Sequence, residues 1–137
     1  MIIGLGQDIC DVNRINAIIS RFGDRFKKRI YTESEIIKCE SRYNSVDSYA
    51  RRFAAKEACS KALGTGFKEG VYYKDIEIKN LPSGKPTISL NGTALKILES
   101  ICPKGSKPMI EISITDDKKL AMAIVIITYN FKECNVI

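Results

Sequence analysis

The sequence predicts an α+β fold, because helical patterns fill its first half and strand patterns dominate its second half. The expected strands of the second half are separated by short turns, which favours antiparallel pairing. The chain has 137 residues, which is enough for one hydrophobic core and too few for two. We therefore expect a single domain over residues 1–137.

The first segment, MIIGLGQDICDV, is predicted to be a buried β-strand. The apolar residues that support this prediction are Met1, Ile2, Ile3, Leu5 and Ile9. Gly4 and Gly6 lack side chains, so a second backbone or a ligand could approach the strand there. Asp8 is unexpected in such a strand, because burying an unpaired polar group costs roughly 2–7 kcal/mol. It either caps the structure that follows or has a partner elsewhere in the chain.

Three helices are predicted to follow this strand. Asn13 can cap the first helix, whose apolar stripe ends at Gly23. Thr32 and Glu35 have the spacing of a capping box and begin the second helix. The third and longest helix is expected over residues 47–63, where apolar residues recur at helical intervals.

The second half is predicted to form two strand pairs separated by a helix. In chain order we expect a strand over 73–80, a turn over 82–86, a strand over 87–90, a helix over 91–101, and a hairpin of strands 111–115 and 120–130 around the turn 116–119. The last strand is apolar on both faces, so we expect a helix or another subunit to cover its second face.

The net charge of +6 is unevenly placed. In residues 21–29, five basic residues stand against one acidic residue. This segment predicts an acidic partner, which could be nucleic acid, a membrane surface or an acidic protein. No apolar run is long enough to span a membrane, and the first residues lack the basic start of a secretory signal.

The cysteine and histidine content limits the possible chemistry. The five cysteines form no C-x-x-C pair and histidine is absent, which argues against a Cys/His zinc site and excludes a Ser-His-Asp triad. An odd number of scattered cysteines indicates reduced thiols and a cytoplasmic location.

Two charged residues fall on the apolar stripe of the long helix. At about 100° per residue, Glu57 and Lys61 lie close to Ala50 on the helical wheel, where the period calls for core residues. The alternative is a solvated ion pair four residues apart, worth roughly 0.2–0.5 kcal/mol. We interpret the pair as part of a polar site. The two inward carboxylates, Asp8 and Glu57, suit Mg²⁺, which completes its shell with water and phosphate oxygens.

Two segments resemble the signature motifs of the holo-acyl-carrier-protein synthases, the bacterial 4'-phosphopantetheinyl transferases. Residues 4–15, GLGQDICDVNRI, resemble the first motif, and residues 52–66, RFAAKEACSKALGTG, resemble the second nearly residue for residue. The turn NLPSGKP and the final strands ISITDD and AMAIVI also fit, so the resemblance covers essentially the whole chain. It implies the 4'-phosphopantetheinyl transferase fold, a homotrimer, and an active site at a subunit interface.

The resemblance also implies a reaction. Coenzyme A, the co-substrate, donates its 4'-phosphopantetheine group to a serine of apo-acyl carrier protein in fatty acid biosynthesis, and adenosine 3',5'-bisphosphate is released. Asp8 and Glu57 match the Mg²⁺ ligands of the family, and Lys61 matches a lysine near the transferring phosphate. Because no imidazole is available, Glu57 is our candidate for the base that accepts the serine proton, either directly or through a metal-bound water.

Further residues match positions that lie near the substrates in the family. The candidate coenzyme A contacts are Lys61, Gly64, Thr65, Gly66, Asn80, Gly84, Lys85, Pro86 and Thr115. Taken alone, the Gly-Thr-Gly stretch among them is more simply the C-cap of the long helix. Arg14, Arg21 and Arg25 correspond to the basic first-helix surface that binds the acidic carrier protein. Thr115 stands where relatives usually carry a histidine near the nucleotide phosphates, and it brings no charge there.

Two other functions stay open. The basic segment 21–29 could belong to a nucleic-acid-binding module, although no RNA- or DNA-binding signature accompanies it. The replacement at Thr115 would also fit a trimer that binds coenzyme A without transferring anything. We expect the transferase, with no nucleic acid and no membrane among its partners.

Overall fold

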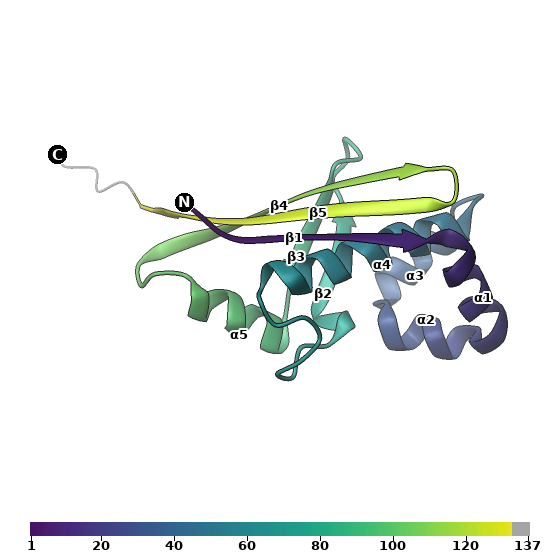
Figure 1. Cartoon of the computed structure of the whole chain (residues 1–137), viewed down its shortest axis with the longest axis horizontal. Coiled ribbons are helices and arrows are strands. Elements are labelled where there is room, and N and C mark those ends of the chain that lie inside the picture. Colours follow the sequence, from purple (N-terminus) through teal and green to yellow (C-terminus); the bar gives the residue numbers. More distant parts are fainter. Residues whose placement is uncertain (133–137) are drawn as a thin grey trace.

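The computed structural model describes residues 1–132, and Cys134 lies outside that range. Figure 1 shows the long strands along one side of the molecule and the helices along the other. In chain order the elements are β1 (Ile2–Asp11), α1 (Val12–Phe22), α2 (Asp24–Ile30), α3 (Glu33–Glu40), α4 (Ser45–Ala62), a short 3-10 helix η1 (Tyr73–Asp75), β2 (Ile76–Asn80), β3 (Pro86–Leu90), α5 (Gly92–Ile101), β4 (Ser106–Asp117) and β5 (Leu120–Phe131). The predicted α+β class is confirmed. Within the described part of the chain, no helix is both long and apolar enough to cross a membrane.

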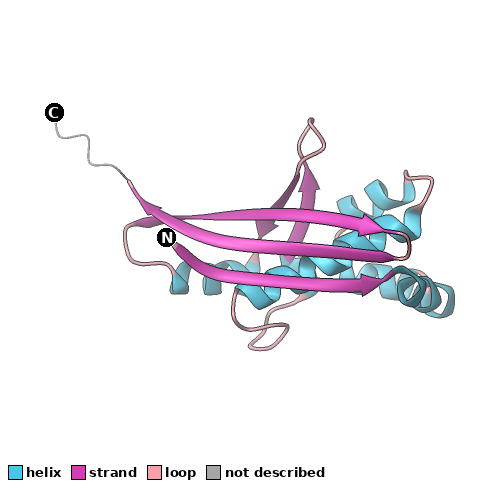
Figure 2. Cartoon of the chain, turned by 45° about the horizontal axis from the view of Figure 1, so that its top comes forward, coloured by secondary structure: helices cyan, strands magenta, loops and turns pink. Residues whose placement is uncertain are grey.

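The strands form two antiparallel sheets. β5 lies between β1 and β4 in a three-stranded sheet, while β2 and β3 form a separate hairpin. Figure 2 shows the helices gathered on one side of the three-stranded sheet. β4 begins at Ser106, earlier than predicted, and includes Pro108. A proline is tolerated there because β4 is an edge strand, which does not need every backbone N–H for pairing.

The two glycines of β1 let α4 pack directly on the strand. A Cβ built at Gly6 would lie 1.9 Å from the carbonyl oxygen of Ala58, and one at Gly4 would lie 2.2 Å from that of Ala62. No side chain fits in such a gap, so the backbones of β1 and α4 are in contact. The predicted approach of a second backbone is thereby confirmed, and it brings the first motif next to the second.

The helix boundaries correct several local predictions. Asp11, and not Asn13, caps α1, because its carboxylate accepts a hydrogen bond from the backbone N–H of Asn13 at 2.8 Å. Gly23 ends α1 at a φ of +55°, as predicted, but α2 follows at once and was not predicted. The capping box of Thr32 and Glu35 is present at the start of α3.

The central helix α4 is enclosed on two sides. One side faces β1 and β5 through small residues such as Ala58, which is fully buried. The other side carries Lys56, whose ammonium is fully buried and lies 2.7 Å from the equally buried Glu35 carboxylate of α3. A helix buried on two sides has no single inward stripe, so the prediction of one inward face was incomplete.

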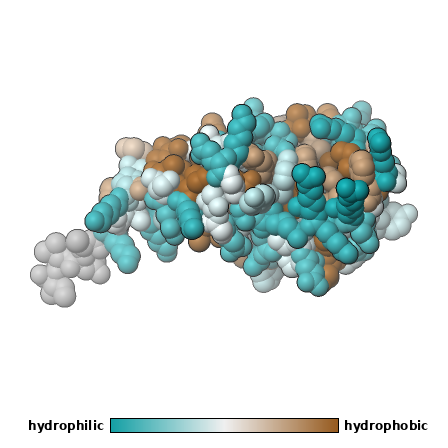
Figure 3. Space-filling view, turned by 90° about the horizontal axis from the view of Figure 1, so that it is seen from below, coloured by the Kyte–Doolittle hydropathy of each residue, from teal (hydrophilic) through white to brown (hydrophobic). Residues whose placement is uncertain are grey.

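The sheet face turned away from the helices is apolar and exposed. Side chains alternate along β5, so that residues such as Ala123 and Val125 face the helices. The opposite face carries Leu5, Ile9, Met109, Leu120, Met122 and Ile124, which are 38–63% exposed. The prediction that Leu5 and Ile9 are buried is therefore wrong for the isolated chain. We call these six residues the open face. Figure 3 shows the helix-covered side instead, which is mostly hydrophilic with hydrophobic patches.

Candidate active site

Asp8 and Lys61 meet where β1 contacts α4. The ammonium of Lys61 lies 3.0 Å from Oδ1 of Asp8 and also donates to the carbonyl of Gln7 at 3.0 Å. Of the two alternatives predicted for Asp8, a capping role or a partner elsewhere in the chain, the structure therefore shows the second. The Asp8 side chain is 18% exposed, but that of Lys61 is 52% exposed. The predicted inward position of Lys61 is wrong, because this side of α4 opens to solvent beside β1.

Glu57 lies one turn before Lys61 on α4. Its Oε1 accepts a hydrogen bond of 2.6 Å from the hydroxyl of Tyr73 in η1. Burial is the main cause that raises the pKa of Tyr73, and this hydrogen bond is the second. The charges of Glu57 and Asp8 raise that pKa further, whereas the charge of Arg14 lowers it. The hydroxyl therefore keeps its proton and remains a hydrogen-bond donor. Since the charges of Asp8 and Glu57 both act on this hydroxyl and Asp8 pairs with Lys61, we treat Asp8, Glu57 and Lys61 as one cluster.

Cys10 on β1 lies beside this cluster. Burial, and next the charge of Asp8, raises the pKa of the Cys10 thiol to about 11. A thiol with such a pKa is protonated at neutral pH, so it is a poor nucleophile there. The chemistry of the cluster is left to its carboxylates and its ammonium.

The donor set fits a hard cation such as Mg²⁺. Within residues 1–132, no group of three or more His, Cys, Asp or Glu side chains is placed so that it could hold a metal ion, so a cage made of these side chains alone is not available. Two carboxylates, Asp8 and Glu57, are what Mg²⁺ takes from a protein when water and phosphate oxygens complete its shell. In addition, the ammonium of Lys61 already places a positive charge at Oδ1 of Asp8.

The Gly-Thr-Gly stretch that follows Lys61 forms the end of α4. Gly64 and Gly66 have φ angles of +86° and +58°, and the N–H of Gly66 donates to the carbonyl of Ser60 at 3.0 Å. The hydroxyl of Thr65 donates to the carbonyl of Gly66. These contacts are those of a helix cap. A Cβ built at either glycine meets no atom within 4 Å, so the backbone is accessible from outside.

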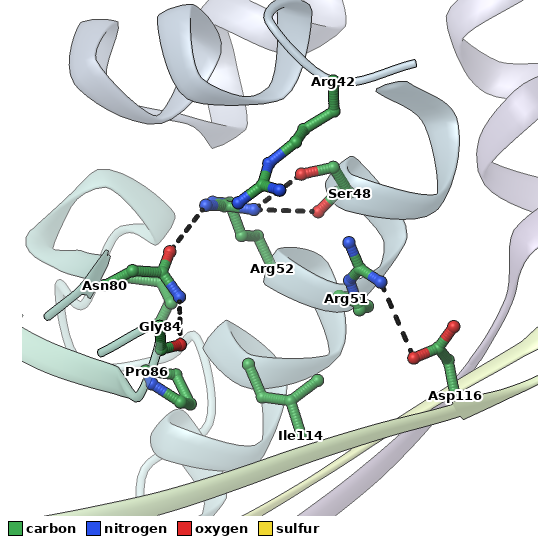
Figure 4. A pocket seen from close by; sticks show the side chains of 10 residues that line it. Arg42, Ser48, Arg51, Arg52, Asn80, Gly84, Pro86, Ile114 and Asp116 are labelled. Atoms are coloured by element: carbon green, nitrogen blue, oxygen red, sulfur yellow. Dashed lines mark hydrogen bonds and ion pairs between the residues drawn. The ribbon is translucent and has the colours of Figure 1, made fainter. Parts of the chain in front are cut away.

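A second polar region lies between the start of α4 and the β2–β3 hairpin (Figure 4). Two arginines of α4 and one from the loop after α3 converge on a pocket of about 260 Å³. The pocket is lined by Arg42, Ser48, Arg51, Arg52, Ile78, Asn80, Gly84, Pro86, Ile114 and Asp116. Three guanidinium groups against one carboxylate favour an anionic ligand. We call this the basic pocket.

Arg52 is the best-defined side chain of the basic pocket. It is only 6% exposed, and it donates to Asn80 Oδ1 at 3.1 Å and to the hydroxyl of Ser48 at 2.7 Å. Its Nε is buried without a hydrogen-bond partner among the described residues. Asn80 in turn donates to the carbonyl of Gly84 at 3.1 Å, which holds the hairpin turn against α4. These arginines were not among the predicted site residues, although Arg52 is the first residue of the second motif and Arg51 directly precedes it.

Three of the nine predicted coenzyme A contacts, Asn80, Gly84 and Pro86, line the basic pocket, and among the others Lys85 and Thr115 point elsewhere. Lys85 points to β4, where its ammonium lies 3.1 Å from the carboxylate of Glu111. Thr115 lies between Ile114 and Asp116, which line the pocket, so strand alternation turns its exposed side chain to the opposite face of the sheet. Thr115 and the hairpin turn therefore do not line one pocket within a single chain.

The predicted carrier-binding arginines lie on two helices. Arg14 and Arg21 belong to α1, but Arg25 belongs to α2, so the basic surface extends beyond the first helix. A cavity of about 450 Å³ beside it is lined by Ile18, Phe22, Arg25, Phe26, Arg29, Ile30, Phe53 and Tyr73. Phe22, which lines this cavity, is 47% exposed. The basic surface thus adjoins Tyr73 and, through it, Glu57.

The two polar regions leave α4 in opposite directions. Arg52 and Lys61 are nine residues apart, which at about 100° per residue separates their directions by about 180°. Asp8, Glu57 and Lys61 therefore lie on one side of α4, and Arg52 with its partners Ser48 and Asn80 lies on the other. A ligand that contacts both regions of one chain would have to pass around the helix.

Known proteins match this chain over nearly its whole length. The family model of the 4'-phosphopantetheinyl transferase superfamily matches residues 4–125. A protein of Rhizobium leguminosarum bv. trifolii named holo-acyl-carrier-protein synthase is 57% identical over 127 residues, which cover 93% of this chain and 95% of the relative. A protein of Methylobacterium nodulans with the same name is 51% identical over 127 residues, which cover 93% of this chain and 96% of the relative.

Solved structures agree with the sequence matches. The holo-acyl-carrier-protein synthase of Neisseria meningitidis has a TM-score of 0.83 at 34% identity, covering 93% of this chain and 99% of the other. That of Helicobacter pylori, solved in complex with coenzyme A, has a TM-score of 0.77 at 31% identity, with coverages of 90% and 99%. The resemblance carried by the two motifs is thereby confirmed, and the chain belongs to the 4'-phosphopantetheinyl transferase superfamily.

Proposed function

We propose that this chain transfers the 4'-phosphopantetheine group of coenzyme A to a serine of apo-acyl carrier protein, as a step that prepares the carrier for fatty acid biosynthesis. The supporting observation is the ion pair of Asp8 from the first motif with Lys61 from the second at the contact of β1 and α4, with Glu57 one helical turn before Lys61. The names of the relatives and the coenzyme A complex of a structural neighbour point to the same reaction.

The transfer displaces one oxygen by another at phosphorus. The serine oxygen forms a bond to the phosphorus that bears the pantetheine arm, the bond from that phosphorus to the bridging oxygen breaks, and adenosine 3',5'-bisphosphate leaves with the electron pair. Glu57 accepts the serine proton. Lys61 places its ammonium beside the phosphate oxygens, where charge develops. Asp8 and Glu57 would hold Mg²⁺, which when bound neutralises charge on the pyrophosphate.

The role of Glu57 as the base has a direct test. Glu57→Gln keeps the size of the side chain and removes its basicity, so turnover should fall by roughly 10²–10⁴-fold while coenzyme A still binds. Full turnover in a variant that binds coenzyme A and Mg²⁺ normally would assign the proton to another group.

We assign the basic pocket to the nucleotide end of coenzyme A. Its arginines match the charge of the released bisphosphate, and the buried, unpartnered Nε of Arg52 offers one more donor. Because this pocket and Lys61 lie on opposite sides of α4, we propose that neighbouring copies in a homotrimer complete each site. The apolar open face supports association, since exposed apolar patches of this kind mark interaction surfaces.

Mixing two inactive variants tests the shared site. Lys61→Ala and Arg52→Ala should each be nearly inactive alone. If each site takes Lys61 from one subunit and Arg52 from a neighbour, random reassembly of equal amounts should restore about one quarter of the wild-type activity. No recovery, with subunit exchange verified by light scattering and mass spectrometry, would show that each chain builds its own site.

The carrier protein is proposed to bind the basic surface of α1 and α2. Arg14→Glu or Arg21→Glu should raise the KM for the carrier and leave that for coenzyme A unchanged, because only the acidic partner meets the reversed charge. Lys96→Glu, the same charge change on an exposed position of α5, is the matched control. An unchanged carrier KM in both arginine variants would remove this surface from the interface.

The first experiment is intact-mass spectrometry of apo-acyl carrier protein incubated with this protein, coenzyme A and Mg²⁺, with an EDTA control. We expect a gain of one phosphopantetheine that EDTA abolishes. Binding of coenzyme A without transfer would favour a silent paralogue. Salt-dependent binding of RNA or DNA, with neither phosphopantetheine transfer nor coenzyme A binding, would favour a nucleic-acid-binding module.

The four cysteines within the described range are free, which supports a cytoplasmic location.

A further inference from the structure

Tyr73 is held at both ends by consecutive residues of α4. Its backbone carbonyl accepts a hydrogen bond from the Lys56 ammonium at 3.0 Å. Its hydroxyl donates to Oε1 of Glu57 at 2.6 Å. Because Lys56 and Glu57 are neighbours in the sequence, one turn of α4 fixes both the backbone and the tip of this tyrosine.

The Lys56 end of this arrangement is firmly anchored. The ammonium pairs with the Glu35 carboxylate at 2.7 Å, with both side chains fully buried, and it also donates to the carbonyl of Ile76. The second oxygen of Glu35 accepts from the backbone N–H of Ile78 at 3.1 Å. Moving a buried charge away from such partners leaves it unpaired and carries a large desolvation cost. The carbonyl of Tyr73 therefore has a fixed position.

Two aromatic rings hold the side chain of Tyr73. Its ring centroid lies 5.7 Å from that of Phe53 and 3.6 Å from that of Phe67, with interplanar angles of 21° and 18°. A tyrosine side chain has only two torsions before its hydroxyl, so a stacked ring leaves the hydroxyl oxygen in one place. The hydrogen bond to Glu57 thus starts from a fixed donor.

Glu57 has no comparable support of its own. A glutamate has three side-chain torsions and loses considerable entropy when it is fixed. Among the described residues, its carboxylate receives one hydrogen bond, which comes from Tyr73. A group that must meet a reacting atom in a defined geometry needs such support from its surroundings.

We propose that Tyr73 is a positioning residue for the phosphopantetheine transfer: its hydroxyl holds Oε1 of Glu57 and leaves Oε2 to face the reacting groups. The inference rests on the proposed function. It adds to that function a residue outside both motifs, and it gives a reason why Lys56, which is buried and paired with Glu35, directly precedes the reacting carboxylate of Glu57 in the sequence.

The test compares two tyrosines that are neighbours in the chain. Tyr73→Phe keeps the stacked ring and removes the hydroxyl, so kcat should fall about ten-fold while both KM values change less than two-fold. Tyr72→Phe removes a hydroxyl from a side chain that is 70% exposed and should have no effect. Melting temperatures close to wild type confirm that both variants fold. Wild-type kcat in Tyr73→Phe, or equal losses in both variants, would overturn the proposal.

A second comparison asks whether Tyr73 acts through Glu57. In a Glu57→Gln background, followed under single-turnover conditions by intact mass, Tyr73→Phe should lower the rate less than two-fold further. If the two losses multiply instead, the hydroxyl acts independently of Glu57 and the proposal is wrong.

The hydrogen bond between Tyr73 and Glu57 can also be tested by NMR spectroscopy, without any substrate. In protein with ring-labelled ¹³C-tyrosine, the resonance that disappears in Tyr73→Phe should shift in Glu57→Gln, and an unshifted resonance would refute the contact. If the wild type transfers nothing to any apo-carrier, the proposed function fails, and the role of Tyr73 in transfer fails with it. A shifted resonance would then establish the hydrogen bond alone, so the two failures are distinguishable.

Discussion

Replacing Gly6 by alanine should separate α4 from β1. The added Cβ would lie 1.9 Å from the carbonyl oxygen of Ala58 and 2.6 Å from the backbone nitrogen of Ala62. Ordinary contact begins at 3.4 Å, so the gap must widen by 1.5 Å. Both obstacles are backbone atoms of one helix, which cannot rotate aside as a side chain would. The helix itself has to move, and with it the residues of the second motif.

The expected cost follows from this geometry. Overpacking of a core costs about 1–3 kcal/mol, and two rigid backbone contacts place Gly6→Ala at about 3 kcal/mol. For a chain of this size that lowers the melting temperature by about 12 °C. The shift of α4 should also lengthen the 3.0 Å contact of Lys61 with Asp8, so protein that still folds should lose transfer activity.

The measurement is urea unfolding followed by circular dichroism, because the sequence has no tryptophan for fluorescence. Wild type and variants are compared at one protein concentration, since association adds to the apparent stability. Gly23→Ala is the control: its Cβ meets nothing within 4 Å, although its φ of +55° costs about 1–2 kcal/mol. Stability of Gly6→Ala equal to or above that of this control would refute the steric argument.

Three further predictions concern buried charge, acid stability and the position that departs from the relatives. Lys56→Met leaves the Glu35 carboxylate buried without its partner and should destabilise the fold by about 3–5 kcal/mol, whereas the double variant with Glu35→Leu should recover part of this in urea unfolding. The hydrogen bond from Lys27 holds the pKa of Glu40 below its ordinary value of 4.5, so the folded state binds fewer protons than the unfolded state there. This stabilisation is present above pH 4.5 and is lost as the pH falls through the lower, folded pKa; Glu40→Gln should therefore flatten the acid limb of a plot of unfolding midpoint against pH. Finally, because Thr115 faces away from the basic pocket of its own chain, Thr115→His should lower the KM for coenzyme A by adding a hydrogen-bond donor at the nucleotide site of a neighbouring copy, and calorimetry showing unchanged or weaker binding would contradict that role.

Local signals in the sequence predicted much of the fold. The capping box at Thr32, the end of α1 at Gly23 and the short turns all depend on neighbouring residues, and all are present in the structure. By contrast, α2 was missed because it is a short, charged helix whose support comes from tertiary contacts, such as the edge-on packing of Phe26 against Tyr31 at 6.0 Å. A count of charges does not distinguish a basic loop from a basic helix.

The site was predicted through its motif residues and missed where distant segments meet. A helical wheel assumes one buried side, but α4 lies between the sheet and the layer formed by α3 and β2, so Lys56 is buried while Lys61 is exposed. Nothing in the sequence spacing connects Tyr73 with Glu57. That contact depends on the path of the chain after α4, which is a tertiary property. The deep burial of Arg52 has the same origin.

The opposite directions of Lys61 and the basic pocket have a kinetic consequence. If copies of the chain complete each other's sites, folding of one chain yields no enzyme, and activity appears only after chains collide. Refolding from denaturant should then show a lag that shortens as the protein is concentrated, although the helical signal of each chain recovers at a constant rate. In a growing cell, the onset of carrier loading would depend on the abundance of this chain more steeply than in direct proportion.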